Sequence, residues 1–98
     1  MAFKIIWLPK AEKRYDEIMA WLEDNWSDKE IVKFVSRTDE VLDIISKHPE
    51  TYKLSEQKNI RQAPITKHNL LLYRKKGGKI ELVPFFDTRQ KPSKKFRQ

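Results

Sequence analysis

The C-terminal half of the chain carries side chains that could act on a phosphodiester. Arg61, Arg74 and Arg89 keep their charge at any physiological pH, and each guanidinium can contact two phosphate oxygens at once. Metal-free cleavage of RNA also needs a general base and a general acid, and His68 is of the residue type that most often serves in these roles. We therefore take Arg61, Arg89 and His68 as candidate catalytic residues. The candidate contacts to phosphate or to another target are Arg61, Arg74, Arg89 and Lys91.

The alternative to a catalytic or binding role for these residues is a structural one. Arg61 could form a surface ion pair with an acid of the helical half, and a lone histidine at the start of a strand is often solvated. Tyr73 alternates with apolar residues, which indicates packing against the covered face of a sheet rather than catalysis.

The charge of the chain is divided unequally. Residues 1–57 have a balance of −3, whereas residues 58–98 have a balance of +10, which together give the net charge of +7. A dense positive half attracts phosphate backbones or an acidic protein surface. A solvated basic tail, residues 91–98, is the alternative explanation.

Composition bounds the class of protein. A chain of 98 residues predicts one domain, residues 1–98. The chain has no cysteine and two histidines, which argues against disulfides, thiolate chemistry and a zinc site. It has neither an apolar run of membrane-spanning length nor the pattern of an export signal. We therefore expect a cytoplasmic protein with no cofactor, no metal and no membrane partner.

Two amphipathic helices are predicted to position these side chains. The first covers residues 10–25, and the second begins at Asp28 and ends before His48-Pro49. Ser27 and Glu30 have the spacing of a capping box. So short a connection predicts an antiparallel hairpin. The apolar stripes are Ala11, Tyr15, Ile18, Met19, Leu22 and Trp26 in the first helix, and Ile31, Phe34, Val35, Thr38, Val41, Leu42 and Ile45 in the second.

The rest of the chain has the pattern of strands. Residues 3–8 predict an N-terminal strand, and residues 59–65, 69–75 and 79–86 predict a three-stranded antiparallel sheet. Gly77 and Gly78 suit the tight turn of a hairpin. Pro64 and Pro84 each remove a donor from the ladder, which predicts strand ends or edges at both points. The fold class is therefore α+β, with the helical hairpin on one face of the sheet.

The order of these elements, and the residues at their joints, resemble the RelE/ParE toxin family over nearly the whole chain. The segments that carry the resemblance are Pro9-Lys10-Ala11 with Tyr15, Ile18 and Trp21; Ile44-Ile45-Ser46-Lys47-His48-Pro49; Asn59-Ile60-Arg61-Gln62; His68-Asn69-Leu70-Leu71-Leu72-Tyr73-Arg74; and residues 82–92, which run from Leu82-Val83-Pro84 through Arg89 to Pro92.

The resemblance implies the toxin of a type II toxin–antitoxin module, of the kind also called plasmid stabilisation proteins. Such a toxin inhibits growth and is neutralised by a cognate antitoxin encoded beside it. RelE-like members cut mRNA on the ribosome, and ParE-like members inhibit DNA gyrase without being nucleases. Catalytic relatives of the RelE type usually place a His or Tyr just after the last strand, where residues 87–96 have neither.

That departure favours a ParE-like toxin that acts by protein binding, with DNA gyrase as a candidate target. The first alternative is a metal-independent, ribosome-dependent mRNA endoribonuclease, so whether the chain is an enzyme stays open. The second alternative is a non-toxic basic module that binds nucleic acid. Trp21 and Ile44 lie off the main stripes of their helices, so we expect them to contact the antitoxin, although partial burial within the hairpin is an alternative.

Overall fold

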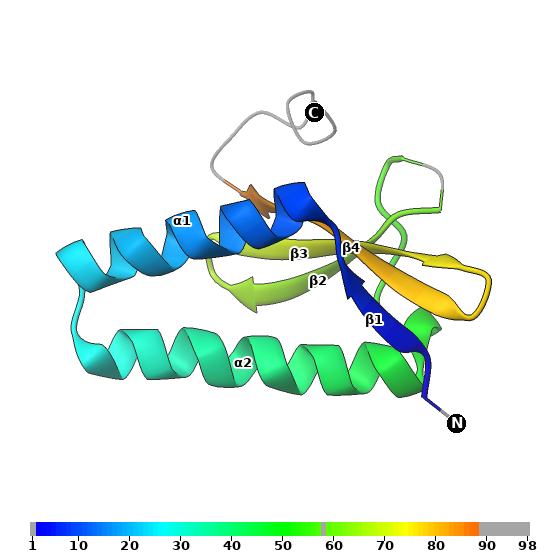
Figure 1. Ribbon diagram of the computed structural model, residues 1–98, viewed down its shortest axis with the longest axis horizontal. Helices are drawn as coiled ribbons and strands as arrows, with labels where there is room; N and C mark the ends of the chain where they lie inside the picture. The colour runs from blue at the N-terminus through cyan, green and yellow to red at the C-terminus, as the bar shows by residue number, and fades with distance from the viewer. Residues whose placement is uncertain (1, 58, 89–98) are drawn as a thin grey trace.

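Two helices follow each other almost directly along the chain. The computed structural model describes residues 2–57 and 59–88, and in it α1 spans Pro9–Asn25 and α2 spans Asp28–Lys47. Pro9 stands in the first turn of α1, where its missing N–H leaves no helical hydrogen bond unmade. Figure 1 shows the two helices antiparallel on one face of a sheet. The predicted helical hairpin is confirmed.

α2 begins at the residue that the sequence predicts, but the prediction of a capping box is wrong. Ser27 is the N-cap in an extended conformation, and its side chain makes no capping hydrogen bond. The N–H of Glu30 instead donates to the backbone carbonyl of Ser27 (3.0 Å). Glu30 lines a groove between the two helices.

The sheet has one strand more than the predicted three. Its strands are β1 (Lys4–Trp7), β2 (Arg61–Thr66), β3 (Asn69–Lys76) and β4 (Lys79–Asp87), in the order β1-β4-β3-β2. β2, β3 and β4 are antiparallel neighbours, as predicted. β1 joins as a fourth strand and pairs with β4 in parallel, because the helical hairpin carries the chain back before the later strands begin. The α+β class is confirmed, and the sheet is mixed. A short 3-10 helix, η1 (Pro49–Thr51), follows α2.

Glycine and proline fix the irregular points of the sheet. Gly77 has a φ of +62° in the turn between β3 and β4, as the hairpin requires. Pro64 lies on the edge strand β2, as predicted. Pro84 was predicted at a strand end or edge, which is wrong, because it lies inside the central strand β4. The register there shifts between Leu70 and Leu72, and such a bulge leaves a ladder position where a missing N–H loses no hydrogen bond.

The main core lies between the helices and the sheet. Aromatic rings join its layers: the ring centroid of Tyr15 lies 5.2 Å from that of Trp7 and 5.5 Å from that of Phe34, and Phe34 lies 6.0 Å from Phe85. The other buried members are Ala11, Val41, Ile45, Ala63, Ile65, Leu71, Tyr73, Ile80 and Leu82. A second cluster on the opposite face of the sheet consists of Ile60, Leu72, Val83 and Phe86. No helix in the described part of the chain has the length and apolar character of a membrane span.

Candidate functional site

Arg61 is held at the first position of β2. Its side chain is half-buried, and its Nη1 donates to the backbone carbonyl of Tyr52 (2.8 Å). A bridge between Leu54 and Arg61 pairs the preceding loop with the strand at the same point. The guanidinium therefore stabilises the entry of the chain into the sheet, and within the described residues it forms no ion pair with an acid of the helices, which was its alternative role.

Tyr73 lies opposite Arg61 on β3 and is fully buried. Its hydroxyl donates to the carbonyl of Pro49 (2.6 Å), which ties η1 to the sheet. Burial raises the pKa of Tyr73 to about 12, against the opposing effect of the Arg61 charge. Tyr73 therefore keeps its proton near neutral pH and has a packing role, as its alternation with apolar residues indicated.

Replacing Tyr73 by phenylalanine tests this role. We expect Tyr73→Phe to lower the free energy of unfolding at pH 7 by about 1–2 kcal/mol, because the Pro49 carbonyl loses its donor. The pKa is raised in the folded state, so wild-type stability is complete below pH 10 and is lost as pH rises towards 12, by up to about 2–3 kcal/mol. Urea unfolding followed by circular dichroism from pH 7 to 12 should show a correspondingly flatter profile for the variant. Parallel profiles for the two proteins would contradict the assignment.

His68 lies beyond the end of β2 that is far from Arg61, and Arg74, although next to Tyr73 on β3, points to the opposite face of the sheet from Arg61. His68 is exposed in the turn between β2 and β3, where its carbonyl accepts from the N–H of Thr88 (3.0 Å). Arg74 lies one residue beyond Tyr73 and donates from Nε to the carboxylate of Glu81 on β4 (2.7 Å). This hydrogen bond is the largest cause that lowers the pKa of Glu81. The predicted catalytic and phosphate-binding residues are therefore not gathered at one point of the described structure.

The strand order explains why Arg61 does not meet the end of β4. Arg61 could approach the end of β4 only if β2 and β4 were neighbours, but β3 lies between them and they run in the same direction. Arg61 is level with Tyr73 and hence with Leu82, whereas β4 ends at Asp87, five residues or roughly 16 Å further on. Arg89, Lys91 and the basic tail 91–98 lie outside the described residues.

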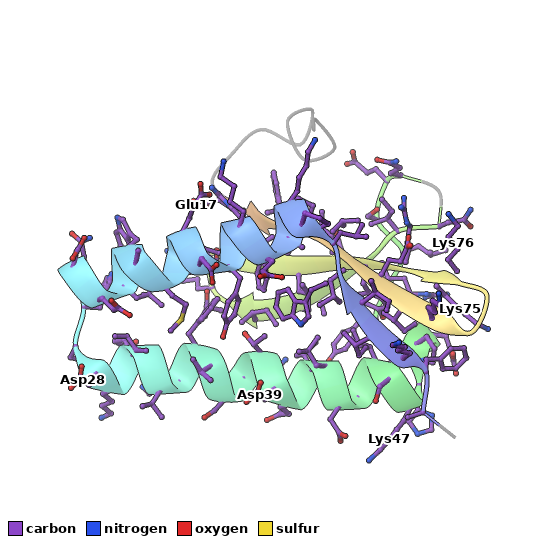
Figure 2. The ribbon with its side chains drawn as sticks, viewed as in Figure 1. Glu17, Asp28, Asp39, Lys47, Lys75 and Lys76 are labelled. Carbon is purple, nitrogen blue, oxygen red and sulfur yellow. The ribbon has the colours of Figure 1, made fainter. Side chains whose placement is uncertain are left out.

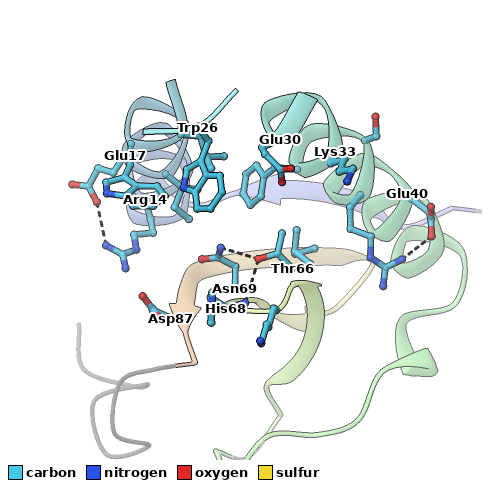
Figure 3. Close-up of a pocket in the computed structure, with 18 residues that line it drawn as sticks. Arg14, Glu17, Trp26, Glu30, Lys33, Glu40, Thr66, His68, Asn69 and Asp87 are labelled. Carbon is cyan, nitrogen blue, oxygen red and sulfur yellow. Dashed lines mark hydrogen bonds and ion pairs between the residues drawn. The ribbon is translucent and has the colours of Figure 1, made fainter. Parts of the chain in front are cut away.

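A groove opens between the two helices and the turn of the β2–β3 hairpin. Figure 3 shows Trp26, Glu30 and Lys33 descending from the helical side towards the turn that carries Thr66, His68 and Asn69. We call this the interhelical groove, and its volume is about 1220 Å³. Its lining residues are Arg14, Glu17, Ile18, Trp21, Leu22, Trp26, Glu30, Lys33, Phe34, Ser36, Arg37, Glu40, Ile65, Thr66, Lys67, His68, Asn69 and Asp87.

Two tryptophans form the exposed apolar surface of this groove. Trp21 and Trp26 are 51% and 54% exposed, and their ring centroids lie 6.2 Å apart. Sequence reasoning singled out Trp21 but assigned Trp26 to the buried stripe. Trp26 follows the last residue of α1 as its C-cap, so its side chain does not continue the helical face. Its position between Asn25 and Ser27 at a helix end was the available signal.

Ile44, the other residue predicted to contact an antitoxin, lies at the opposite end of the hairpin. It is half-buried within one turn of the end of α2, whereas Trp21 lies within two turns of the end of α1. Because the helices are antiparallel, these ends point in opposite directions (Figure 1). The structure therefore does not bring Trp21 and Ile44 together.

The charges around the groove are balanced. The lining contains four cations (Arg14, Lys33, Arg37 and Lys67) and four carboxylates (Glu17, Glu30, Glu40 and Asp87). Ion pairs within single helices join Arg14 to Glu17 (3.6 Å) and Arg37 to Glu40 (2.6 Å). The excess positive charge of the described residues 59–88 is thus not concentrated here. An apolar segment with a mixed-charge margin suits such a groove better than a uniformly acidic one.

Several solved structures share the fold of this chain. The chain is similar to a structure titled "Chromosomal ParDE TA system from P. aeruginosa", with a TM-score of 0.72 and 17% identity. The similarity covers 88% of this chain and 96% of the other chain. The chain is also similar to a YoeB dimer from Staphylococcus aureus (TM-score 0.61, 18% identity, 88% and 97% covered). A YoeB–YefM complex from the same organism gives a TM-score of 0.57 at 17% identity, with the same coverage. At such identities the likeness shows the fold. No curated protein sequence matches the chain significantly.

The amino-acid sequence matches a family profile directly. The profile described as "ParE toxin of type II toxin-antitoxin system, parDE" matches residues 5–92, which is nearly the whole chain and covers every helix and strand of the fold except Lys4, the first residue of β1. The RelE/ParE resemblance seen at the joints of the sequence is thereby confirmed. The chain belongs to the ParE toxin family of type II toxin–antitoxin systems.

Proposed function

We propose that this ParE-family toxin inhibits growth in the cytoplasm by binding a protein target, and that DNA gyrase is this target. The observation that carries the proposal is the scatter of the candidate catalytic groups. Arg61 is bonded to the Tyr52 carbonyl at one end of β2, and His68 lies in the turn beyond its other end. Acid–base catalysis on a phosphodiester needs such groups within hydrogen-bond reach of the same substrate atoms.

Tyr73 adds to this argument. It is the tyrosine nearest to Arg61 in the sheet, but it is fully buried and its hydroxyl is bonded to Pro49. A group with a pKa of about 12 and no access to solvent does not exchange protons with a bound RNA. Protein binding needs no such chemistry, and the family to which the chain belongs supports it.

We further propose that a cognate antitoxin neutralises the toxin by docking in the interhelical groove. Two similar structures are titled as a ParDE system and a YoeB–YefM complex, which supports a protein partner for this chain. The groove suits an amphipathic segment whose apolar side chains pack against Trp21 and Trp26. An antitoxin that also reached Ile44 would have to extend along the length of the hairpin.

Induced expression in a bacterial host, followed by two assays, tests the proposed target. We expect growth to stop, DNA gyrase supercoiling to be inhibited by the purified toxin, and mRNA 5′ ends in a translating extract to stay unchanged. Cleaved mRNA, with cleavage abolished by Arg61→Ala, would instead establish the endoribonuclease. Normal growth on induction would favour the non-toxic nucleic-acid-binding module.

A further inference from the structure

Three lysines lie side by side across the sheet at the end away from the exposed tryptophans. Lys79 on β4 is directly opposite Lys76 on β3, and it is also paired with Lys4 on β1. We call these three residues the lysine row. Figure 1 shows that the β3–β4 hairpin projects at the end of the molecule opposite the α1–α2 turn, and Figure 2 shows Lys76 at this hairpin.

The alternation of side chains places the lysine row on the face of the sheet opposite the helices. Ile5, next to Lys4, and Ile80, next to Lys79, both belong to the main core. Lys75, next to Lys76, lies over the ring of Phe3 with its Nζ 4.8 Å from the centroid. Neighbouring residues of a strand point to opposite faces, so the three lysines share the other face.

Positive charge exceeds negative charge at the row, although the charges of Lys76 and Lys79 help to lower the pKa of the Glu81 carboxyl. All three side chains are exposed, and within residues 2–57 and 59–88 no ion pair joins any of them to a carboxylate. Glu81 is the next residue of β4 on the same face, but its carboxylate is bonded to Arg74. Like charges directly opposite each other on neighbouring strands destabilise a sheet. A row of three is therefore a feature that folding alone does not favour.

We propose that the lysine row binds the phosphodiester backbone of a nucleic acid. Lysine ammonium groups on adjacent strands present a line of point charges, and such charges contact phosphates without regard to base sequence. The large apolar side chains that are exposed in the described residues, Trp21, Trp26, Val32 and Leu54, are all outside the hairpin. A protein interface needs apolar anchors of this kind, so the row suits a polyanion better than a protein surface.

This assignment divides the molecule into two functional ends. The interhelical groove, with its paired tryptophans and balanced charge, faces a protein segment. The lysine row, with its exposed charge and tight glycine turn, faces a nucleic acid. The assignment does not depend on which target the toxin inhibits, because the row binds the nucleic acid directly.

A salt titration of the full 98-residue chain tests the proposal. The probe is a fluorescein-labelled 20-base-pair DNA duplex followed by anisotropy, and an RNA stem-loop is titrated in a second arm. We compare the wild type with Lys4→Gln/Lys76→Gln/Lys79→Gln. A matched control, Lys10→Gln/Lys13→Gln/Lys29→Gln, removes the same charge from exposed positions of the helices. A third variant replaces the row by arginine.

The expected result is a loss specific to the lysine row. The row variant should bind about tenfold or more weakly at 100 mM salt. Its slope of log K against log salt should be smaller by about 2–3, since each phosphate contact contributes about 0.9. The affinity of the helical control should stay within about threefold of that of the wild type. The arginine variant should bind as tightly as the wild type, because it keeps the charge of the row. Comparison of the two arms identifies duplex DNA or RNA as the better source of the backbone.

Two results would overturn the proposal. One is an equal loss in the row variant and the helical control, which would mean that only net charge matters. The other is competition by polyglutamate as effective as that by unlabelled DNA of equal charge, which would indicate an acidic protein partner. Thermal unfolding shows whether the row variant binds weakly only because it is unfolded. Removing like charges from the row should leave the midpoint of unfolding unchanged or raise it.

Discussion

Replacing Trp21 and Trp26 together by alanine is expected to weaken antitoxin binding by at least about a hundredfold. Both rings are about half exposed and contact each other at the groove. Buried tryptophans in interfaces contribute about 2 kcal/mol or more each, and neighbouring ones do not add fully. The fold should tolerate the change, because neither ring is part of the main core. Isothermal titration with the protein encoded beside the toxin gene would measure the affinity.

Val32→Ala/Leu54→Ala provides the matched control for this prediction. Both side chains are large, apolar and exposed, and neither lines the interhelical groove. Their truncation should leave the affinity within about threefold of the wild type. If both double variants bound the antitoxin as tightly as the wild type, docking in the groove would be wrong. Growth inhibition by the tryptophan variant should persist even when the antitoxin is co-expressed.

Truncation of Phe34 is expected to have the largest effect on stability. Its side chain is 2% exposed on α2, and its ring contacts Tyr15 of α1 and Phe85 of β4. Removing a buried phenylalanine side chain costs about 3–5 kcal/mol, which combines lost transfer free energy with a residual cavity. The total stability of such a domain is about 5–15 kcal/mol. Phe34→Ala should therefore unfold at a much lower urea concentration.

Val32→Ala, two residues earlier on the same helix, separates packing from helix propensity. Val32 is 61% exposed, so its truncation should change the free energy of unfolding by no more than about 0.5 kcal/mol. Chemical denaturation of both variants, followed by circular dichroism, provides the comparison. A Phe34→Ala variant as stable as Val32→Ala would mean that Phe34 does not join the two helices to the sheet.

Local patterns in the sequence were sufficient for most of the fold. The three- and four-residue apolar steps predict both helices, and the paired glycines predict the β3–β4 turn, because each depends on nearby residues alone. The parallel pairing of β1 with β4 was not predicted, since it depends on which strand edge the chain reaches after the helices. Pro84 was misplaced for a related reason: a bulge shows in the register of two strands and not in either one alone.

The candidate site was harder to predict than the fold. Residue type suggested Arg61 and His68, but β2 begins at Arg61 and ends before His68, so the strand separates the two residues. Trp26 has the correct helical spacing for burial, yet α1 ends just before it. The lysine row shows the same difficulty, because Lys4 is more than seventy residues from Lys76 in the chain and meets it only through Lys79. Such sites depend on topology, which residue types and spacing do not determine.

The pairing of β1 with β4 also bears on when the toxin can fold during synthesis. Residues 4–7 find their partners only at residues 79–82, so the sheet stays incomplete until residues 79–82 have been translated. Contacts between such distant segments form late, because a long loop must close first. An emerging chain therefore lacks the finished sheet on which both helices pack.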